Sequence, residues 1–418
     1  MSKKLSYTSR PIKGCQICDA KKLESVLFVG FIPPVNTMPA VGSTPVEEPA
    51  YPLELLRCPK CTLVQIGLEV NPNILFPPEY PYLSASTRIL RENFADLYKK
   101  TNELMNLKPS DLIIDIGSND GTLLSNFKNG GHRVLGIEPS LASRIANKNG
   151  VKTKMAFFSE KTAKQVKKEA GAATVVTAAN VFAHIGDIHS VVKGIVHLLA
   201  PNGVFISESH YLLSLVETLQ YDTIYHEHLR HYSLRSLMYL LGKQGLEVFH
   251  VERIPTHGGS VRVYSARKGS RPVQPSVKDL LAEEDAAGLT DGSGLVTFRQ
   301  RVVQSKIDLY ALLAPLKKSG ARIYGIGAPS RASTLLNYIG LDDGILDAVM
   351  EIKTSHKVNK YMPGTRVPVL DEALLYKNQP EYALLLSWHI TNELVANLKK
   401  NGYRGKFITP LPEPRIIG

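Results

Sequence analysis

The sequence predicts an α/β protein in three parts: an N-terminal tetracysteine module, a doubly wound parallel sheet and a C-terminal Rossmann-like α/β unit. Three observations predict it. All four cysteines lie within the first 61 residues, apolar runs alternate with helix-like segments from residue 112 to 208, and a second alternation opens near residue 323. A chain of 418 residues is also too long for one core. We place the three domains at residues 1–78, 79–294 and 295–418.

The cysteines form two C-x-x-C pairs, Cys15 with Cys18 and Cys58 with Cys61. Paired C-x-x-C turns let four thiolates surround zinc as a tetrahedron, and a reducing cytosol disfavours disulfides. Four sulfur ligands leave no open position for water or substrate, so we predict a structural Zn²⁺ site. Between the pairs, residues 31–35 and 45–52 are expected to be irregular and too poor in core to fold without the metal.

A glycine-rich turn follows the first apolar run of the sheet. It contains Asp115, Gly117, Asn119, Asp120 and Gly121 and precedes a helix-like segment. The glycines remove side chains where backbone must approach a ligand, and the helix N-terminus offers free N–H groups. We therefore predict a cofactor-binding turn.

The acidic residues favour S-adenosylmethionine as that cofactor. Glu138 ends the next apolar run, 21 positions after Gly117, where a carboxylate can accept hydrogen bonds from both ribose hydroxyls. Asp115 and Asp120 would repel a pyrophosphate but attract the amino and sulfonium groups of S-adenosylmethionine. The alternatives are a dinucleotide site and an ordinary strand–turn–helix, which explains the glycines but not the acids. Tyr80 and Tyr82 lie at the start of this domain in a Pro- and Tyr-rich stretch, where they either cover a ligand or pack.

The alternation continues through five strands. A helix is expected at residues 88–107, further helices at 142–149, 160–170 and 188–199, and strands at 112–116, 133–138, 151–155, 174–177 and 203–208. Such an order implies a mostly parallel sheet with helices on both faces and ligands at the carboxyl ends of the strands.

Two polar groups follow strands four and five. They are Asn180, which we expect to contact the cofactor, and His184 after strand four, and Tyr225, His226, Glu227 and His228 after strand five. The N-P-P-Y motif of amino-group methyltransferases is missing after strand four. The second group exceeds what a turn requires, and we favour acid/base work over a metal site because no H-E-x-x-H arrangement is present.

The remaining chain offers candidate anion sites. His257 and Ser260 lie at the turn of a strand pair, and residues 269–294 have the composition of a linker. After a helix at 296–318, Ser330 and Arg331 open a helix that could hold phosphate at its N-terminus. Lys357 and Tyr361 lie in a basic loop, with a solvated loop as the alternative.

Composition limits the partners and the compartment. The first residues have no apolar signal region and no run is long enough to span a bilayer, so we expect a cytoplasmic protein without a membrane partner. The net charge of +12 favours an anionic partner. Because the lysines are scattered along helices, we favour a solvated face over a nucleic-acid surface. We expect the protein to be a monomer.

Together these motifs resemble a family of sugar C-methyltransferases that act on nucleotide-linked 4-keto-6-deoxy sugars. The resemblance rests on paired C-x-x-C, G-S-N-D-G-T-L-L, N-V-F-A-H, Y-H-E-H, H-G-G-S-x-R-V-Y, G-A-P-S-x-x-x-T-L-L-N-Y and K-Y-M-P-G-T-x-x-P. It implies zinc, S-adenosylmethionine and C-terminal domains and transfer of a methyl group to C-3' of the sugar. The chain departs from relatives at Arg331, where lysine is frequent, and at Ile352-Lys353.

The resemblance also implies roles for residues. His228 would be the general base that removes the C-3' proton, which the C-4' ketone acidifies. Tyr225 and His184 would donate to the enolate oxygen, and Glu227 would orient His228 or a sugar hydroxyl. Substrate contacts are expected from Tyr80, His226, His257, Ser260, Ser330, Arg331, Lys357 and Tyr361. The competing function is a zinc-module nucleic-acid methyltransferase, which would bind oligonucleotides with strong salt dependence.

Overall fold

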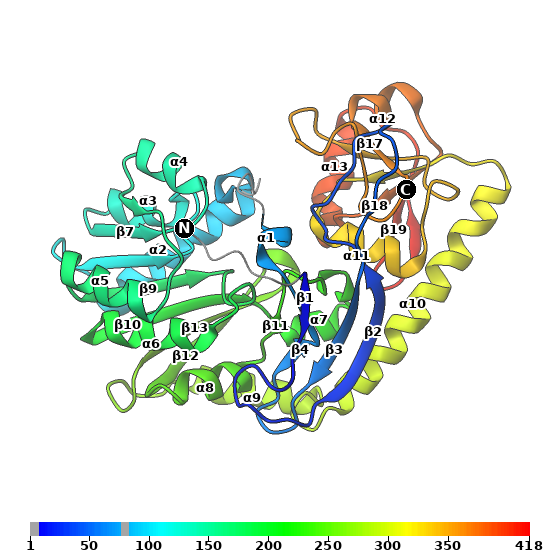
Figure 1. Cartoon of the computed structure of the whole chain (residues 1–418). Coiled ribbons are helices and arrows are strands. Elements are labelled where there is room, and N and C mark those ends of the chain that lie inside the picture. Colours follow the sequence, from blue (N-terminus) through cyan, green and yellow to red (C-terminus); the bar gives the residue numbers. More distant parts are fainter. Residues whose placement is uncertain (1–7, 77–82) are drawn as a thin grey trace.

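Two seven-stranded sheets and one four-stranded sheet organise the computed structural model, which describes residues 8–76 and 83–418 (Figure 1). The four-stranded sheet has the order β11-β4-β3-β2. Its strands are β2 (Glu24–Ile32), β3 (Tyr51–Arg57), β4 (Val64–Ile66) and β11 (Arg230–His231), and a separate pair joins β1 (Ser9–Pro11) to β5 (Leu68–Val70). A short helix, α1 (Pro72–Leu75), follows.

The structure agrees only in part with the expectation of irregular chain at residues 31–35 and 45–52. Residues 33–50 form no helix and no strand, but residues 31–32 end β2 and residues 51–52 begin β3. β2 and β3 form an antiparallel pair there, and β3 buries alternate side chains, as a strand with one covered face does. The fourth strand of this sheet, β11, comes from the segment that joins two strands of the first seven-stranded sheet. The N-terminal module is therefore completed by chain that lies far away in sequence, and the predicted domain boundaries remain a prediction.

The first seven-stranded sheet confirms the predicted doubly wound fold. Its order is β12-β13-β10-β9-β6-β7-β8, with five parallel strands and an antiparallel hairpin at one edge. The strands are β6 (Leu112–Ile116), β7 (Arg133–Ile137), β8 (Thr153–Lys154), β9 (Ala173–Ala179), β10 (Leu199–His210), β12 (Leu246–Ile254) and β13 (Ser260–Arg267).

Helices cover both faces of this sheet because its strands are apolar on both sides. Ile113 and Val175 pack in a cluster with α2 and α3, whereas their neighbours Ile114 and Val176 pack in another with α5 and α6. The helices are α2 (Arg88–Met105), α3 (Thr122–Asn129), α4 (Ala142–Lys148), α5 (Glu160–Ala170), α6 (Ile188–Leu198), α7 (Leu212–Glu217), α8 (Leu234–Gly242) and α9 (Pro275–Ala286), with short turns η1 (Ser84–Ser86), η2 (Tyr221–Thr223) and η3 (Thr256–Gly258).

Helix α9 corrects the predicted linker. It starts with Pro275 at the first helical turn and buries Val277, Leu280 and Glu284. Glu284 accepts hydrogen bonds from the Tyr211 hydroxyl (2.9 Å) and from the backbone N–H of Leu234. The segment therefore packs against β12 and α8 of this part of the chain and is not a linker.

The second seven-stranded sheet has the order β16-β17-β15-β14-β18-β19-β20. The long helix α10 (Ser293–Lys318) leads into it, as Figure 1 shows. Its elements are β14 (Ile323–Ile326), α11 (Ser330–Ile339), β15 (Ala348–Glu351), β16 (Lys360–Tyr361), β17 (Pro368–Asp371), α12 (Ala373–Asn378), β18 (Tyr382–Leu385), η4 (Trp388–Ile390), α13 (Thr391–Lys400), β19 (Lys406–Thr409) and β20 (Arg415–Ile417).

The N-terminal module also touches this C-terminal sheet. The chain between β2 and β3 passes beside β17 (Figure 1), where the Tyr361 N–H donates to the Pro39 carbonyl at 2.8 Å. Arg366 forms an ion pair with Glu48 at 2.7 Å. Among the residues described, no helix is long and apolar enough to cross a membrane.

Candidate active site and zinc centre

The four cysteines converge as the sequence predicts. Their sulfur atoms lie within 4.8 Å of one another, with Cys15 and Cys61 Sγ 3.3 Å apart and Cys18 and Cys58 Sγ 3.4 Å apart. All four are buried and none forms a disulfide. Four soft ligands at this spacing suit tetrahedral zinc, whose sulfur ligands lie about 2.3 Å from the metal.

The turn after β6 brings the cofactor candidates against the segment after β9. Gly117 has φ +70°, and a Cβ added to it would lie 2.3 Å from Val181 Cγ1. Gly121 has φ +81° and caps α3. Glycine is therefore required at Gly117 by both conformation and space.

Two of the three acids build this turn. Glu138 accepts from the backbone N–H groups of Asn119 (3.0 Å) and Ser140 (2.8 Å). Asp120 accepts from the Ala85 N–H (2.8 Å) and from the Thr122 hydroxyl (2.6 Å). The Asp120 carboxylate is thus explained by capping of α3 and by anchoring η1.

Asp115 differs because its carboxylate is buried and forms no ion pair with any residue that the structure describes. It accepts from the Thr177 hydroxyl at 2.7 Å. Burial, with added repulsion from Glu138 and Glu208, raises the pKa of Asp115 to about 7. An ammonium group placed beside it would stabilise the ionised form.

His184 and His228 are brought together at the carboxyl ends of β9 and β10. Their ring centroids are 5.0 Å apart, and the Tyr225 ring lies 4.1 Å from that of His228. His228 Nδ1–H donates to the Thr223 carbonyl at 2.8 Å, and His184 Nδ1–H donates to the Glu227 carbonyl at 2.8 Å. Both rings therefore keep Nε2 as the nitrogen with the lone pair.

Burial keeps these imidazoles neutral. It lowers the pKa of His184 to about 4, and burial together with the neighbouring His184 and His231 holds the pKa of His228 well below its usual range. A neutral imidazole with a free Nε2 is the form that accepts a proton.

Glu227 and His226 contact residues of the N-terminal module. Glu227 is buried, and its carboxylate accepts from Asn36 Nδ2 at 2.7 Å. His226 Nε2–H donates to the Pro52 carbonyl at 3.4 Å, with its ring 5.9 Å from Tyr51. His226 therefore packs against the N-terminal module rather than beside His228.

The predicted cofactor residue Asn180 also lies at this end of the sheet. It has φ +59°, and its N–H donates to the Glu208 carbonyl at 2.8 Å. Tyr80 and Tyr82 lie outside the described residues.

Several predicted substrate residues have protein partners instead. Arg331 makes a bidentate ion pair with Asp222, with both N–O distances 2.7 Å, so it is not the free phosphate-binding cation that the sequence suggested. Ser260 is buried and donates to the Thr256 carbonyl at 3.0 Å. The Tyr361 hydroxyl accepts from the Gly42 N–H at 3.3 Å.

Other substrate candidates remain near the site. Lys357 Nζ donates to the Ala328 carbonyl at 2.6 Å, just before Ser330, the half-buried first residue of α11. Burial lowers the pKa of Lys357, and the negative charge of Glu227 opposes part of that shift. His257 is exposed on η3 with φ +56°. These groups lie where the C-terminal sheet faces the His228 loop.

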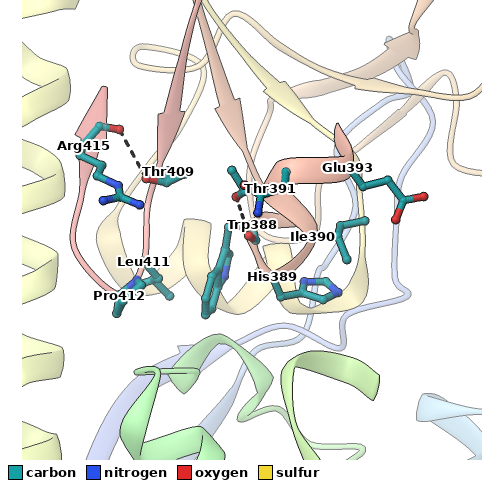
Figure 2. A pocket seen from close by; sticks show the side chains of 10 residues that line it. Trp388, His389, Ile390, Thr391, Glu393, Thr409, Leu411, Pro412 and Arg415 are labelled. Atoms are coloured by element: carbon teal, nitrogen blue, oxygen red, sulfur yellow. Dashed lines mark hydrogen bonds between the residues drawn. The ribbon is translucent and has the colours of Figure 1, made fainter. Parts of the chain in front are cut away.

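A cavity of about 440 Å³ opens in the C-terminal domain beside this region (Figure 2). It is lined by Trp388, His389, Ile390, Thr391, Asn392, Glu393, Thr409, Leu411, Pro412 and Arg415. Most of these residues follow β18 or β19, at the carboxyl ends of parallel strands, where open α/β sheets bind ligands. Sequence reasoning missed them because the strand-end rule was applied only to the first sheet.

Comparisons with known proteins agree with this arrangement. The chain is 32% identical to C-methyltransferase NovU of Streptomyces niveus over 413 residues, which covers 98% of this chain and 97% of that protein. The chain belongs to the C-methyltransferase family. It matches a putative zinc binding domain at residues 15–76, a methyltransferase domain at 88–251 and a C-methyltransferase C-terminal domain at 255–412.

Two similar solved structures each cover less than half of this C-methyltransferase. PH0226 from Pyrococcus horikoshii OT3 is 16% identical and covers 48% of this chain and 97% of its own, with a TM-score of 0.36. Magnesium protoporphyrin IX methyltransferase from Synechocystis PCC 6803 with bound SAM is 14% identical and covers 43% of this chain and 79% of its own, with a TM-score of 0.34.

Family membership and the site together establish the coarse function. The protein is an S-adenosylmethionine-dependent C-methyltransferase with a structural zinc centre at its four cysteines. When bound, the cofactor supplies a methyl group on a sulfonium. The residues of the turn after β6 fit it through a close backbone approach at Gly117 and the buried carboxylate of Asp115.

Proposed function

We propose that the enzyme methylates C-3' of a nucleotide-linked 4-keto-6-deoxy sugar, with His228 as the general base. The observation that carries this proposal is the state of the His228 ring. Its Nδ1–H is committed to the Thr223 carbonyl at 2.8 Å and burial keeps the ring neutral, so Nε2 can accept a proton. Carbon methylation requires such a base, because a carbon nucleophile must first be formed.

A continuous set of contacts links this base to the cofactor turn. Val181 packs on Gly117, and the His184 N–H donates to the Val181 carbonyl at 3.0 Å. The His184 ring then lies 5.0 Å from that of His228. This short path supports placing the acceptor carbon between the turn and His228, as in-line transfer requires.

The neighbouring groups suit an enolate. Removal of the C-3' proton by His228 Nε2 moves negative charge to the C-4' oxygen, which needs hydrogen-bond donors. Tyr225 is adjacent to His228 and is proposed to supply one. His184 also packs beside His228, but the one N–H of its neutral ring is donated to the Glu227 carbonyl, so the predicted donor role of His184 is not kept. Glu227, whose carboxylate accepts from Asn36 Nδ2, is proposed to orient a sugar hydroxyl.

The nucleotide end is proposed to lie against the C-terminal domain. Ser330 at the N-terminus of α11 and the amino group of Lys357 supply N–H donors and a positive charge for a diphosphate. The cavity beside Trp388 offers room for the rest of the nucleotide. Arg331 is left out of this proposal because Asp222 already pairs with it.

A mass-spectrometric screen tests the proposed substrate. The enzyme is incubated with S-adenosylmethionine and with dTDP-, GDP-, CDP- or UDP-linked 4-keto-6-deoxy sugars, and the expected result is a gain of one CH₂ by at least one of them. The matched control uses the 4-hydroxy forms, which lack the acidifying ketone and should not react. Methylation of the 4-hydroxy sugar, or of oligonucleotides but no sugar nucleotide, would refute the proposal.

A further inference from the structure

One face of α11 lies against the start of the loop that carries His228. Arg331, Thr334 and Tyr338 are spaced three and four residues apart, so they project from the same side of the helix. Arg331 pairs with Asp222, the Thr334 hydroxyl donates to the Ile224 carbonyl at 3.1 Å, and the Tyr338 ring lies 5.1 Å from that of Tyr221. Three consecutive contacts thus join α11 to η2 and the residue after it.

The ion pair at the centre of this contact is buried, and its Asp222 carboxylate accepts a further hydrogen bond. Asp222 is 0% exposed and Arg331 is 7% exposed. Trp388 Nε1–H donates to Asp222 Oδ2 at 2.7 Å, and the Arg331 guanidinium lies 4.9 Å from the Trp388 ring centroid. A buried pair contributes little net stability, because desolvation offsets the attraction, but it strictly constrains geometry.

The constrained peptide carries the acceptor for His228. Thr223 lies between Asp222 and Ile224, both of which α11 holds. The Thr223 N–H and hydroxyl both donate to the Gln220 carbonyl, at 3.0 and 2.8 Å. Its own carbonyl therefore has a fixed direction, and this is the oxygen that receives His228 Nδ1–H at 2.8 Å.

We propose that Arg331 and Thr334 are positioning residues for catalysis: they fix the Thr223 carbonyl, which holds His228 in the tautomer with a free Nε2. The inference rests on the proposed role of His228 as the base. It gives the C-terminal domain a part in proton transfer, through loop geometry, besides any part in binding. Arg331 thereby acts without touching the substrate.

The test compares isosteric variants of Thr334. Thr334→Val removes the hydroxyl and keeps the shape, so it should lower kcat by roughly 10- to 100-fold, the usual effect of losing a group that orients a functional histidine. KM for the sugar nucleotide and affinity for S-adenosylhomocysteine should stay within about two-fold of the wild type, because neither ligand touches Thr334. Thr334→Ser restores the hydroxyl and should recover most of the lost turnover.

A second readout needs no substrate. In ¹⁵N-histidine-labelled enzyme, the His228 signals are identified by their loss in His228→Gln, and they should report an Nδ1–H tautomer in the wild type. Thr334→Val and Arg331→Lys should shift that signal toward a mixture of tautomers. Arg331→Lys keeps the charge but loses the bidentate geometry.

Two results would overturn the inference. One is an unchanged His228 tautomer in both variants, and the other is a loss that falls on KM instead of kcat. A wrong assignment of His228 as the base gives a different result. In that case His228→Gln would keep turnover, whatever the tautomer measurement shows. Should Arg331→Lys fail to fold, the Thr334 pair still decides the question.

Discussion

Gly117 joins the cofactor turn to the catalytic segment, and replacing it by alanine should disturb both. The added Cβ would lie 2.3 Å from Val181 Cγ1, at a residue with φ +70°. The left-handed conformation costs roughly 1–2 kcal/mol for a non-glycine residue. Overpacking of a tight contact costs about 1–3 kcal/mol more, so we expect Gly117→Ala to lose about 2–5 kcal/mol of unfolding free energy.

Gly131 provides the matched control. It has φ +87°, but a Cβ there would meet no atom within 4 Å. Gly131→Ala should therefore show the conformational cost alone, about 1–2 kcal/mol. Denaturant unfolding gives both free energies, and calorimetry with S-adenosylhomocysteine should show weaker binding only for Gly117→Ala.

A double variant isolates the steric part. Val181→Ala removes the methyl groups that the new Cβ would meet, so Gly117→Ala/Val181→Ala should recover part of the cofactor affinity lost by Gly117→Ala. Equal destabilisation by Gly117→Ala and Gly131→Ala, with cofactor affinity unchanged in both, would refute the proposed contact between the turn and the segment after β9.

Three further predictions follow from the same contacts. Zinc chelation should unfold the N-terminal sheet and abolish methyl transfer, because β11, which follows the His228 loop, pairs with β4 of that sheet. Full activity in protein that metal analysis shows to lack zinc would contradict this. Glu138→Ala should weaken binding of S-adenosylhomocysteine, since the Asn119 and Ser140 N–H groups lose their acceptor, and unchanged calorimetric affinity would remove that assignment. Burial lowers the pKa of His231 from 6.5 to about 4, so as the pH falls from 7 to 5 the unfolded chain takes up a proton that the folded chain does not. This difference should remove about 2 kcal/mol of unfolding free energy. In unfolding experiments at the two pH values, His231→Gln should lose correspondingly less.

Local sequence pattern was sufficient to predict the first seven-stranded sheet and the zinc centre. The parallel strands are apolar on both faces, and the C-x-x-C spacing carries its own geometry. In β3 and α9 a local pattern was also present, but the proline and the linker-like composition around it outweighed it in the prediction. β3 alternates buried and accessible residues despite Pro52, and α9 carries Val277, Leu280 and Glu284 at helical spacing between flanks of linker composition.

Tertiary partners could not be predicted from local pattern. Arg331 lies at a helix N-terminus, which suggests phosphate binding, but its partner Asp222 is 109 positions away. The same holds for Glu227, whose carboxylate meets Asn36 from the N-terminal module. Charges pair according to the fold, and the sequence alone gives their type but not their neighbours. His228 and His184 came together as expected because both follow adjacent strands of one sheet.

Solvent exchange of the C-3' hydrogen tests the central claim most directly. With S-adenosylhomocysteine in the cofactor site, no methyl transfer can occur, and the wild type should still exchange that hydrogen of the 4-keto sugar nucleotide with deuterated water. His228→Gln should slow the exchange by roughly two to four orders of magnitude, the usual contribution of a general base. His226→Gln, whose ring packs on the N-terminal module, should retain it. Exchange that persists in His228→Gln at the wild-type rate would contradict the account.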